Sequence, residues 1–356
     1  MRVGIISMQR VYNYGSFLQA YALKKTVESL GHECEFIDIK PGREIVKRKK
    51  KRINYLSKLD KYFLRRIRHY FFAKSRIKCF NDEYWRVLGL TNDTNWDKQY
   101  DVVIIGSDEV FNCTQGKWGL SPNLFGSDIN ANRVITYAAS CGYTNYEDVR
   151  AIGVETEISR LMANISALSV RDENTFNFVI NMTSREPLYH LDPVFIYDYK
   201  NEIVESPLHD EYILVYAYDG RIRDKKEIEE IKRFAKVRNL KTISAGLYQS
   251  WCDRNILANP FELLGYVKNA KYIITDTFHG TVLAIKYNKE FASFIRESNR
   301  YKISFLLKQF SLQRREIVDP TDLTDIFDQP IDYAMINTSI SIYKKKALEY
   351  LSQHLT

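Results

Sequence analysis

The sequence predicts an α/β fold of two domains, each built on a mostly parallel, doubly wound sheet. Three observations support this prediction. The chain has 356 residues, which is too long for one ordinary α/β unit. Strand and helix signals alternate along it, and a polar stretch at 198–210 interrupts the alternation before it starts again. We therefore expect two Rossmann-like domains with a ligand cleft between them.

The first domain is predicted to span residues 1–197. Between its first two strands, apolar residues recur at helical spacing up to Leu30, and Gly31 ends the helix. Short apolar runs, each compatible with a buried strand, predict its strands at residues 2–7, 35–39, 101–106, 134–138, 167–171 and 189–191.

The second domain is predicted to span residues 211–335. One of its helices begins after Asn259, which is followed by proline and, three positions on, by Glu262, a typical helix start. A last helix within 336–356 is expected to pack back on the first domain. The other elements are predicted as strands at 212–218, 242–245, 270–276 and 290–295 and helices at 225–238 and 280–288.

No targeting or metal-binding signal accompanies these elements. Apolar runs such as 102–105 are far shorter than the roughly 20 residues that span a bilayer. The N-terminal residues have the pattern of a first strand and not of a secretory signal. The five cysteines show no CxxC spacing, which favours reduced thiols and no metal site. A cytoplasmic location is therefore expected.

The net charge of +8 comes from one segment, residues 43–78. This segment holds 15 of the 52 Lys and Arg residues but only two of the 44 acidic residues, which leaves 37 basic and 42 acidic residues elsewhere. The run 47–52 is typical of a solvated loop. The stretch after it is amphipathic, because basic residues flank an apolar stripe formed by Leu59, Phe63, Leu64, Ile67, Tyr70 and Phe71.

Two roles for the amphipathic stretch stay open. It could lie on an anionic membrane at the inner face of the bilayer, or it could pack on the protein's own sheet. Nucleic acid is not expected as a partner, because no recognised nucleic-acid fold accompanies the charge.

The strongest candidate site is residues 275–281, between a strand and the helix that starts at Gly280. A helix N-terminus offers free N–H donors and positive potential, so it binds anions well. His279 would stand beside such an anion with a proton that titrates near neutral pH, whereas Thr277, Gly280 and Thr281 would shape the turn. The alternative is that Thr277 or His279 only caps the helix.

Two further strand-to-helix loops are candidates. In the first, Asn13 and Tyr14 precede Gly15, which permits close backbone approach, although no GxGxxG pattern indicates a dinucleotide. In the second, Ser107, Asp108 and Glu109 follow a fully apolar strand, and paired carboxylates there could orient or deprotonate a sugar hydroxyl. An ordinary helix cap remains the alternative for both loops.

Three arginines follow predicted strands and could hold an anion. Guanidinium groups match the geometry of carboxylates and phosphates, although a surface salt bridge is an equally good interpretation of each. They are Arg171, Arg296 and Arg300.

The chain resembles the polysaccharide pyruvyl transferase family. The resemblance spans roughly residues 1–310, and the joint order of its motifs is specific. The motifs are residues 1–5 (MRVGI), 13–23 (NYGSFLQAYAL), 105–112 (IGSDEVFN), 169–172 (SVRD), 192–193 (DP) and 275–281 (TDTFHGT).

The resemblance implies transfer of pyruvate from phosphoenolpyruvate to a hexose of a cell-surface polysaccharide or its lipid-linked precursor, which forms a cyclic ketal. It also implies a GT-B-like glycosyltransferase architecture, with the donor on the second domain and the acceptor on the first. The family histidine corresponds to His279 as general acid, and no cofactor is expected. The alternatives are a nucleotide-sugar-dependent glycosyltransferase and a non-catalytic accessory protein that binds glycan or membrane.

Two positions depart from the family pattern. Family members carry Arg-Leu-His where this chain has residues 277–279 (TFH), so either Arg171, Arg296 or Arg300 replaces the missing arginine or the donor differs. Members often show Gln and Trp where Glu109 and Phe111 stand, and this loop is expected to influence acceptor choice.

Overall fold

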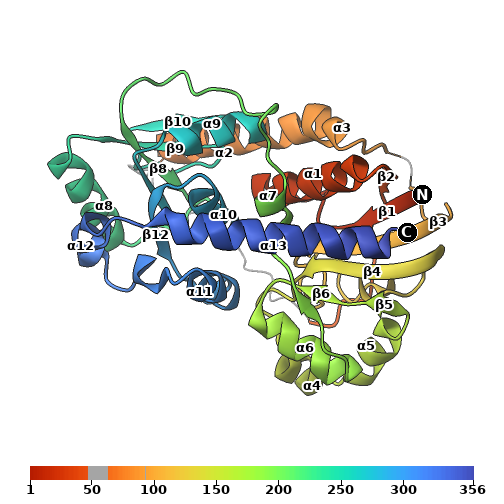
Figure 1. The fold of residues 1–356 in the computed structure, drawn as a ribbon. Helices are drawn as coiled ribbons and strands as arrows, with labels where there is room; N and C mark the ends of the chain where they lie inside the picture. The colour runs from red at the N-terminus through yellow and green to blue at the C-terminus, as the bar shows by residue number, and fades with distance from the viewer. Residues whose placement is uncertain (47–62, 93) are drawn as a thin grey trace.

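The computed structural model describes residues 1–46, 63–92 and 94–356. The chain forms two lobes, each organised around one parallel sheet (Figure 1). The predicted α/β class with two Rossmann-like sheets is therefore confirmed.

The first sheet has the order β2-β1-β3-β4-β6-β7, and β5 also pairs with β4. Its central strand β3 is almost wholly buried, as expected for a strand covered on both faces by helices. The strands are β1 (Arg2–Ile6), β2 (Glu33–Phe36), β3 (Tyr100–Asp108), β4 (Ala131–Ala139), β5 (Ile165–Ala167), β6 (Ser169–Val170) and β7 (Leu188–Tyr189). The helices of this lobe include α1 (Tyr14–Ser29), α3 (Trp85–Val87), α4 (Tyr146–Ile152), α5 (Glu155–Met162), α6 (Glu173–Thr183) and α7 (Pro193–Ile196).

The second sheet has the order β10-β9-β8-β11-β12-β13. All of its pairings are parallel, so the carboxyl ends of its strands lie at one edge. The strands are β8 (Tyr212–Tyr216), β9 (Lys241–Ala245), β10 (Arg254–Ile256), β11 (Tyr272–Thr275), β12 (Glu290–Phe294) and β13 (Glu316–Ile317). The helices are α8 (Lys225–Val237), α9 (Pro260–Asn269), α10 (Phe278–Lys286), α11 (Arg300–Gln309) and α12 (Leu323–Asp328).

The two lobes share a continuous apolar core. The N-terminal half of α1 carries Phe17, whose ring lies 5.6 Å from that of Phe261 in α9. The Tyr14 hydroxyl donates to the carbonyl oxygen of Ala258 at 2.7 Å, and the Tyr14 side chain is buried. These contacts fix α1 against the second lobe and so set the geometry of the cleft.

The C-terminal helix α13 (Tyr333–His354) runs across both lobes and ends beside the N-terminus (Figure 1). The Tyr350 hydroxyl donates to the Thr136 carbonyl oxygen in β4 at 2.9 Å. Arg133 donates to the His354 carbonyl oxygen at 3.0 Å. The helix therefore ties the second lobe to the first sheet.

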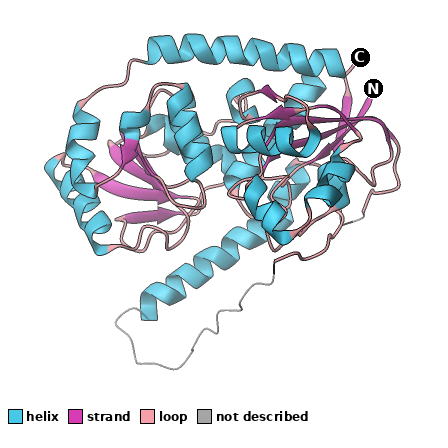
Figure 2. Ribbon diagram, turned by 90° about the horizontal axis from the view of Figure 1, so that it is seen from below, coloured by secondary structure: helices cyan, strands magenta, loops and turns pink. Residues whose placement is uncertain are grey.

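The basic helix α2 (Phe63–Cys79) contacts the second lobe, where His69 and Arg76 meet Asp219 and Phe72 meets Tyr248. It extends from the body of the molecule, as Figure 2 shows for the helix that follows the grey trace, and its inner face meets loops of the second lobe. Tyr70 and Phe71 are each 59% exposed. Membrane contact by this segment stays a prediction, and its part at 47–62 lies outside the described residues.

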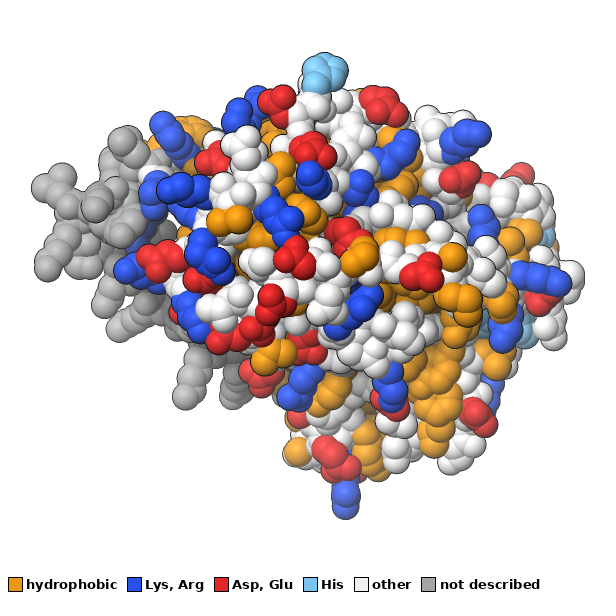
Figure 3. All heavy atoms as spheres, turned by 60° about the vertical axis from the view of Figure 1, so that its left-hand side comes forward, with side chains coloured by type: hydrophobic (Ala, Val, Ile, Leu, Met, Phe, Trp, Pro, Cys, Tyr) orange, Lys and Arg blue, Asp and Glu red, His pale blue; other side chains and the backbone are white. Residues whose placement is uncertain are grey.

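Basic and acidic side chains are interspersed on the face drawn in Figure 3. In the part of the chain that the structure describes, no helix combines the length and the apolar character needed to cross a bilayer.

We predict that α13 contributes to stability through its buried face. Leu351→Ala removes a side chain that is 0% exposed and should lower the free energy of unfolding by about 2–5 kcal/mol. Ile342→Ala, on the same helix but 53% exposed, should change it by less than about 0.5 kcal/mol. Urea denaturation followed by circular dichroism checks this, and equal effects of both substitutions would contradict it.

Candidate active site in the cleft between the lobes

A cavity of about 330 Å³ lies where the two lobes meet. Loops at the carboxyl ends of strands from both sheets form it, which is where ligands bind in open α/β sheets. The first lobe contributes Ser16, Asp108, Glu109, Tyr143 and Arg171, and the second contributes Tyr218, Asp219, Arg221, Phe278, His279, Ser298, Asn299 and Lys302.

His279 stands in the first turn of α10, where it is 7% exposed. Thr277 caps this helix, since its Oγ1 accepts from the backbone N–H of Gly280 at 2.9 Å. The imidazole packs against Gly15 of α1, and a Cβ at Gly15 would lie 2.3 Å from His279 Nδ1. A glycine at position 15 is therefore required for the histidine of one lobe to approach the first helix of the other.

Asp192 faces the histidine from the first lobe. Its Oδ2 lies 3.5 Å from His279 Nε2, and the Asp192 side chain is fully buried. In the described part of the chain His279 Nε2 has no hydrogen-bond partner. The carboxylate is thus placed to balance the charge of a protonated imidazole.

Arg171 connects this carboxylate to a second one. Its Nη1 donates to Asp192 Oδ2 at 2.6 Å, and its Nη2 donates to Asp108 Oδ1 at 3.2 Å. The guanidinium lies over the Phe278 ring, 4.4 Å from the centroid. Ser16 donates its hydroxyl proton to Asp108 Oδ2 at 2.6 Å. Arg171 therefore organises the cavity wall, because both of its terminal nitrogens donate to carboxylates of the first lobe.

The charges hold both carboxyl groups ionised. Burial acts to raise the pKa of Asp108, but Arg171, His279, Lys302 and the Ser16 hydroxyl outweigh it and lower that pKa to about 2. Burial likewise opposes ionisation of Asp192, and the charges of His279 and Arg171 lower its pKa. A carboxylate with a pKa near that of Asp108 is a weak base at neutral pH, so the geometry favours an orienting role over proton abstraction.

Lys302 and Glu109 form a second ion pair at the cavity wall. Lys302 Nζ contacts Glu109 Oε1, and Asn112 donates to Glu109 Oε2 at 2.8 Å. Lys302 is 7% exposed, whereas the Glu109 side chain is 29% exposed, so only the lysine of this pair is buried.

Arg221 also lines the cavity, and one of its terminal guanidinium nitrogens is unused within the described residues. Its guanidinium carbon lies 4.5 Å from the centroid of the Tyr218 ring, and its buried Nη1 has no hydrogen-bond partner among the described residues. The Tyr218 hydroxyl accepts from Asn13 Nδ2 at 2.8 Å, which holds the ring in place. The backbone N–H of Tyr218 donates to Asp276 Oδ1 at 3.0 Å. This arrangement presents a guanidinium to an anion in the cavity.

Several predicted site residues support the cavity without lining it. Asn13 caps α1, and Thr281 is bonded to the Thr277 carbonyl oxygen and the Ser293 hydroxyl. Ser107 is fully buried beside Asp192, with 3.3 Å between its Oγ and Asp192 Oδ2. The capping role that the sequence offered as an alternative for Thr277 is present.

Three predicted ligand residues lie elsewhere. Tyr14 is used in the contact between the lobes, because its ring is buried and its hydroxyl is bonded to Ala258. Arg296 makes a two-pronged ion pair with Glu227 at 2.7 and 2.9 Å. Arg300 lines a neighbouring hollow of about 770 Å³, which shares Tyr143 and Ser298 with the cavity. Neither Arg296 nor Arg300 therefore lines the cavity that contains His279.

Seven residues that line the cavity were not predicted from the sequence: Tyr143, Tyr218, Asp219, Arg221, Ser298, Asn299 and Lys302. Tyr218 and Arg221 follow the first strand of the second domain, so their position after a strand was an available signal. Tyr143 lies in a loop, and Lys302 lies on a helix that no motif marks. Only the folded arrangement brings Tyr143 and Lys302 to the cavity.

The depressed pKa of Asp108 predicts a pH-dependent stability. Its ionised form stabilises the fold above the unfolded pKa of about 3.8, and this contribution of about 2 kcal/mol is lost as pH falls towards about 2. Asp108→Asn should be less stable at pH 6, and its deficit should shrink at pH 3. Urea midpoints at both pH values measure this, with the exposed Asp128→Asn as control. A deficit that does not change with pH would contradict the prediction.

Several solved structures are similar to this chain. The Streptomyces sp. SF2575 glycosyltransferase SsfS6, complexed with thymidine diphosphate, is 11% identical, with 99% of this chain and 98% of that chain covered and a TM-score of 0.50. The UDP-GlcNAc 2-epimerase of Methanocaldococcus jannaschii is 11% identical, with 92% of each chain covered and a TM-score of 0.47. At 11% identity the likeness to SsfS6 concerns the fold alone, and it agrees with the GT-B architecture expected from the sequence.

A third structure is longer. A mutant of the Thermobaculum terrenum O-GlcNAc transferase is 11% identical, with 99% of this chain covered and a TM-score of 0.43. The chain spans 64% of the length of that transferase.

Comparison with curated protein sequences gives no match. The family model for polysaccharide pyruvyl transferases, in contrast, matches residues 13–298, a range that includes every charged residue described around the cavity except Lys302. The resemblance inferred from the sequence motifs is thereby confirmed. The chain belongs to the polysaccharide pyruvyl transferase family.

Proposed function

We propose that the protein transfers pyruvate from phosphoenolpyruvate to a hexose of a cell-surface polysaccharide or its lipid-linked precursor, forming a cyclic ketal. The observation that carries this proposal is that His279 lines the same cavity as Arg171, Arg221 and Lys302. The Asp192 Oδ2 atom lies 3.5 Å from His279 Nε2. The reaction needs a proton donor and a cationic group that binds the anionic donor substrate. His279 and Arg221 line this cavity and supply these two groups.

His279 is assigned the role of general acid. Protonation of the methylene carbon C3 of phosphoenolpyruvate makes C2 electrophilic, and one sugar hydroxyl adds to C2. Phosphate then leaves, and the second hydroxyl closes the ketal. Of the two hydroxyl protons, one replaces the proton that was transferred to the new methyl group, and the other leaves with the phosphate. Asp192 balances the positive charge of His279 before the first proton transfer.

Arg221 is assigned to the anionic groups of the donor. Arg171 and Lys302 are already paired with carboxylates, whereas the Arg221 Nη1 is unpartnered within the described chain. A guanidinium binds a phosphate or carboxylate through parallel hydrogen bonds. Arg221, from the loop after β8, can thus supply the cation that Thr277 does not.

The acceptor sugar is assigned to the neighbouring hollow of about 770 Å³. Tyr143 is 39% exposed and lies between this hollow and the cavity, so its ring can pack on a pyranose face. Asn145, Asp148 and Arg300 supply groups that can hydrogen-bond hydroxyls. This assignment keeps the acceptor near the first lobe and the donor near the second.

The direct test is release of phosphate from phosphoenolpyruvate in the presence of pyranosyl and lipid-linked acceptors, with mass spectrometry of the product. Phosphoenolpyruvate should also raise the melting temperature. No turnover across the acceptor panel together with no thermal shift would refute the proposal. A shift with nucleoside diphosphates but not with phosphoenolpyruvate would favour a nucleotide-sugar transferase, and vesicle binding without turnover on any donor would favour an accessory role.

Replacing His279 should abolish turnover while keeping the fold. Loss of a general acid typically lowers a rate by about 10²–10⁴-fold, so kcat of His279→Ala should fall at least that far. His279→Gln, which preserves more side-chain volume, guards against a packing defect. His209→Ala, which changes an exposed histidine in the polar stretch at 198–210, is the control and should retain full activity. Wild-type turnover in either His279 variant would refute its role.

Replacing Arg221 should weaken donor binding more than it slows chemistry. A hydrogen bond to a charged group contributes about 1.5–3 kcal/mol, so Arg221→Met should raise KM for phosphoenolpyruvate roughly 10–100-fold. Arg233→Met removes a surface arginine that is paired with Glu230 and should have no effect. Steady-state kinetics measure both variants, and an unchanged KM in Arg221→Met would exclude the assigned role.

A further inference from the structure

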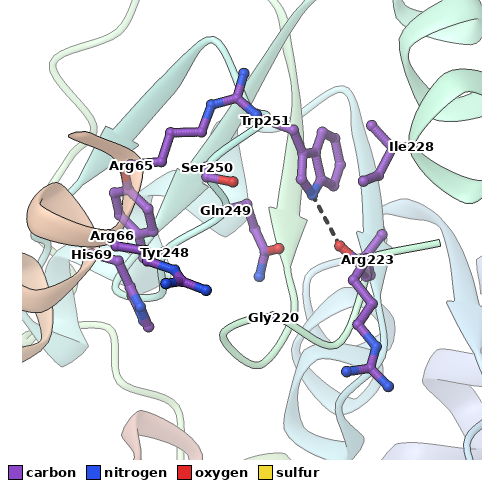
Figure 4. Close-up of a pocket in the computed structure, with 11 residues that line it drawn as sticks. Arg65, Arg66, His69, Gly220, Arg223, Ile228, Tyr248, Gln249, Ser250 and Trp251 are labelled. Carbon is purple, nitrogen blue, oxygen red and sulfur yellow. Dashed lines mark hydrogen bonds between the residues drawn. The ribbon is translucent and has the colours of Figure 1, made fainter. Parts of the chain in front are cut away.

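A second hollow, of about 310 Å³, lies between α2 and the loops that follow β8 and β9 (Figure 4). In Figure 4, Arg65 and Arg66 extend from α2 on one side, and Trp251, Ile228 and Arg223 stand on the other. Three arginines and His69 line the hollow, and no acidic residue is among the described residues that line it. The hollow is therefore complementary to an anion.

Asp219 fixes α2 to the wall of this hollow. Its Oδ2 lies 3.0 Å from Arg76 Nη2 and 3.3 Å from His69 Nε2, and its Oδ1 accepts from the Tyr248 backbone N–H at 2.7 Å. The Tyr248 ring stacks on His69 with 5.4 Å between centroids and also contacts Phe72. The helix is thus held by specific contacts and not only by its charge.

The opposite wall is also held in place. Trp251 is 9% exposed, and its Nε1 donates to the Ile222 carbonyl oxygen at 3.2 Å. The Gln249 amide donates to the Ala217 carbonyl oxygen at 2.7 Å. A site whose walls are fixed in this way loses little entropy when a ligand binds.

One short loop connects the hollow to the catalytic cavity. Residues 218–223 line both spaces. Tyr218, Asp219 and Arg221 line the cavity, whereas Gly220, Ile222 and Arg223 line the hollow. The cavity and the hollow therefore lie on either side of this loop.

The geometry points to a second anion site in this hollow, which binds the phosphate or diphosphate ester of a phosphorylated acceptor. This inference rests on the proposed function, because it assigns one part of the acceptor. Arginine forks match phosphate oxygens, and the apolar surface of Trp251 and Ile228 suits the ester side of such a group.

Isothermal titration with pyrophosphate tests the site without requiring turnover. It is done in an Arg221→Met background, which removes the main anion contact of the catalytic cavity. Adding Arg66→Gln and Arg223→Gln together should raise the Kd for pyrophosphate about tenfold or more. Adding Arg233→Gln, on the outer surface of α8, should leave the Kd unchanged. An equal Kd in the two derivatives would overturn the proposal.

Two further measurements identify the source of the phosphate. With a diphosphate-linked saccharide as acceptor, Arg66→Gln/Arg223→Gln should raise KM and leave kcat and the KM for the same saccharide without phosphate unchanged. An equal rise for both saccharides would overturn the assignment. Vesicles of phosphatidylcholine and phosphatidylglycerol form the other arm. Loss of vesicle binding in this variant with an unchanged pyrophosphate Kd would show that the arginines serve lipid headgroups instead.

The inference and the proposed function can fail separately. A wild-type protein that transfers no pyruvate but binds pyrophosphate through Arg66 and Arg223 would refute the proposed function and retain the anion site. Full transfer activity with no dependence on these arginines would refute the site alone.

Discussion

The buried guanidinium of Arg171 is the interaction on which the cleft depends. It joins Asp108 at the end of β3 to Asp192 before α7, and both of these carboxyl groups are nearly inaccessible to water. A buried ion pair costs desolvation that only good geometry offsets, and removal of one partner leaves an uncompensated charge. The two ion pairs therefore join the carboxyl ends of three strands, because Asp108 ends β3, Arg171 follows β6 and Asp192 follows β7. From this position Asp192 faces His279.

The candidate acid is assembled from both lobes. His279 belongs to α10 of the second sheet, but its carboxylate neighbour and its closest backbone neighbour, Gly15, belong to the first. The buried Tyr14 contact and the helix α13 hold the lobes in this relation. The apolar core that the lobes share thus has a chemical consequence, because separation of the lobes would remove Asp192 from the histidine.

The loop after β8 supplies an arginine to each of two spaces, Arg221 to the cavity and Arg223 to the hollow beside α2. Asp276, directly after β11, accepts from the backbone of Tyr218 and so sets the start of this loop, and Asp219 secures α2 to it. Burial raises the pKa of Asp276 to about 6, because it outweighs the charges of Arg221 and Arg296, whereas the pKa of Asp108, which is paired with Arg171, is lowered. Because the start and the α2 contact of this loop are fixed, Arg221 is held at the cavity and Arg223 at the hollow beside α2.

The sequence by itself determined the two-domain α/β class and the strand-to-helix turn that carries His279, because buried parallel strands and helix caps leave local patterns. It also determined the family, through the order of its motifs. Only the tertiary structure decided which cations reach the cavity. Arg171, Arg296 and Arg300 look alike in sequence, but their partners are distant in the chain, and Lys302 carries no local signal. Charge pairing depends on through-space distances that periodicity does not encode.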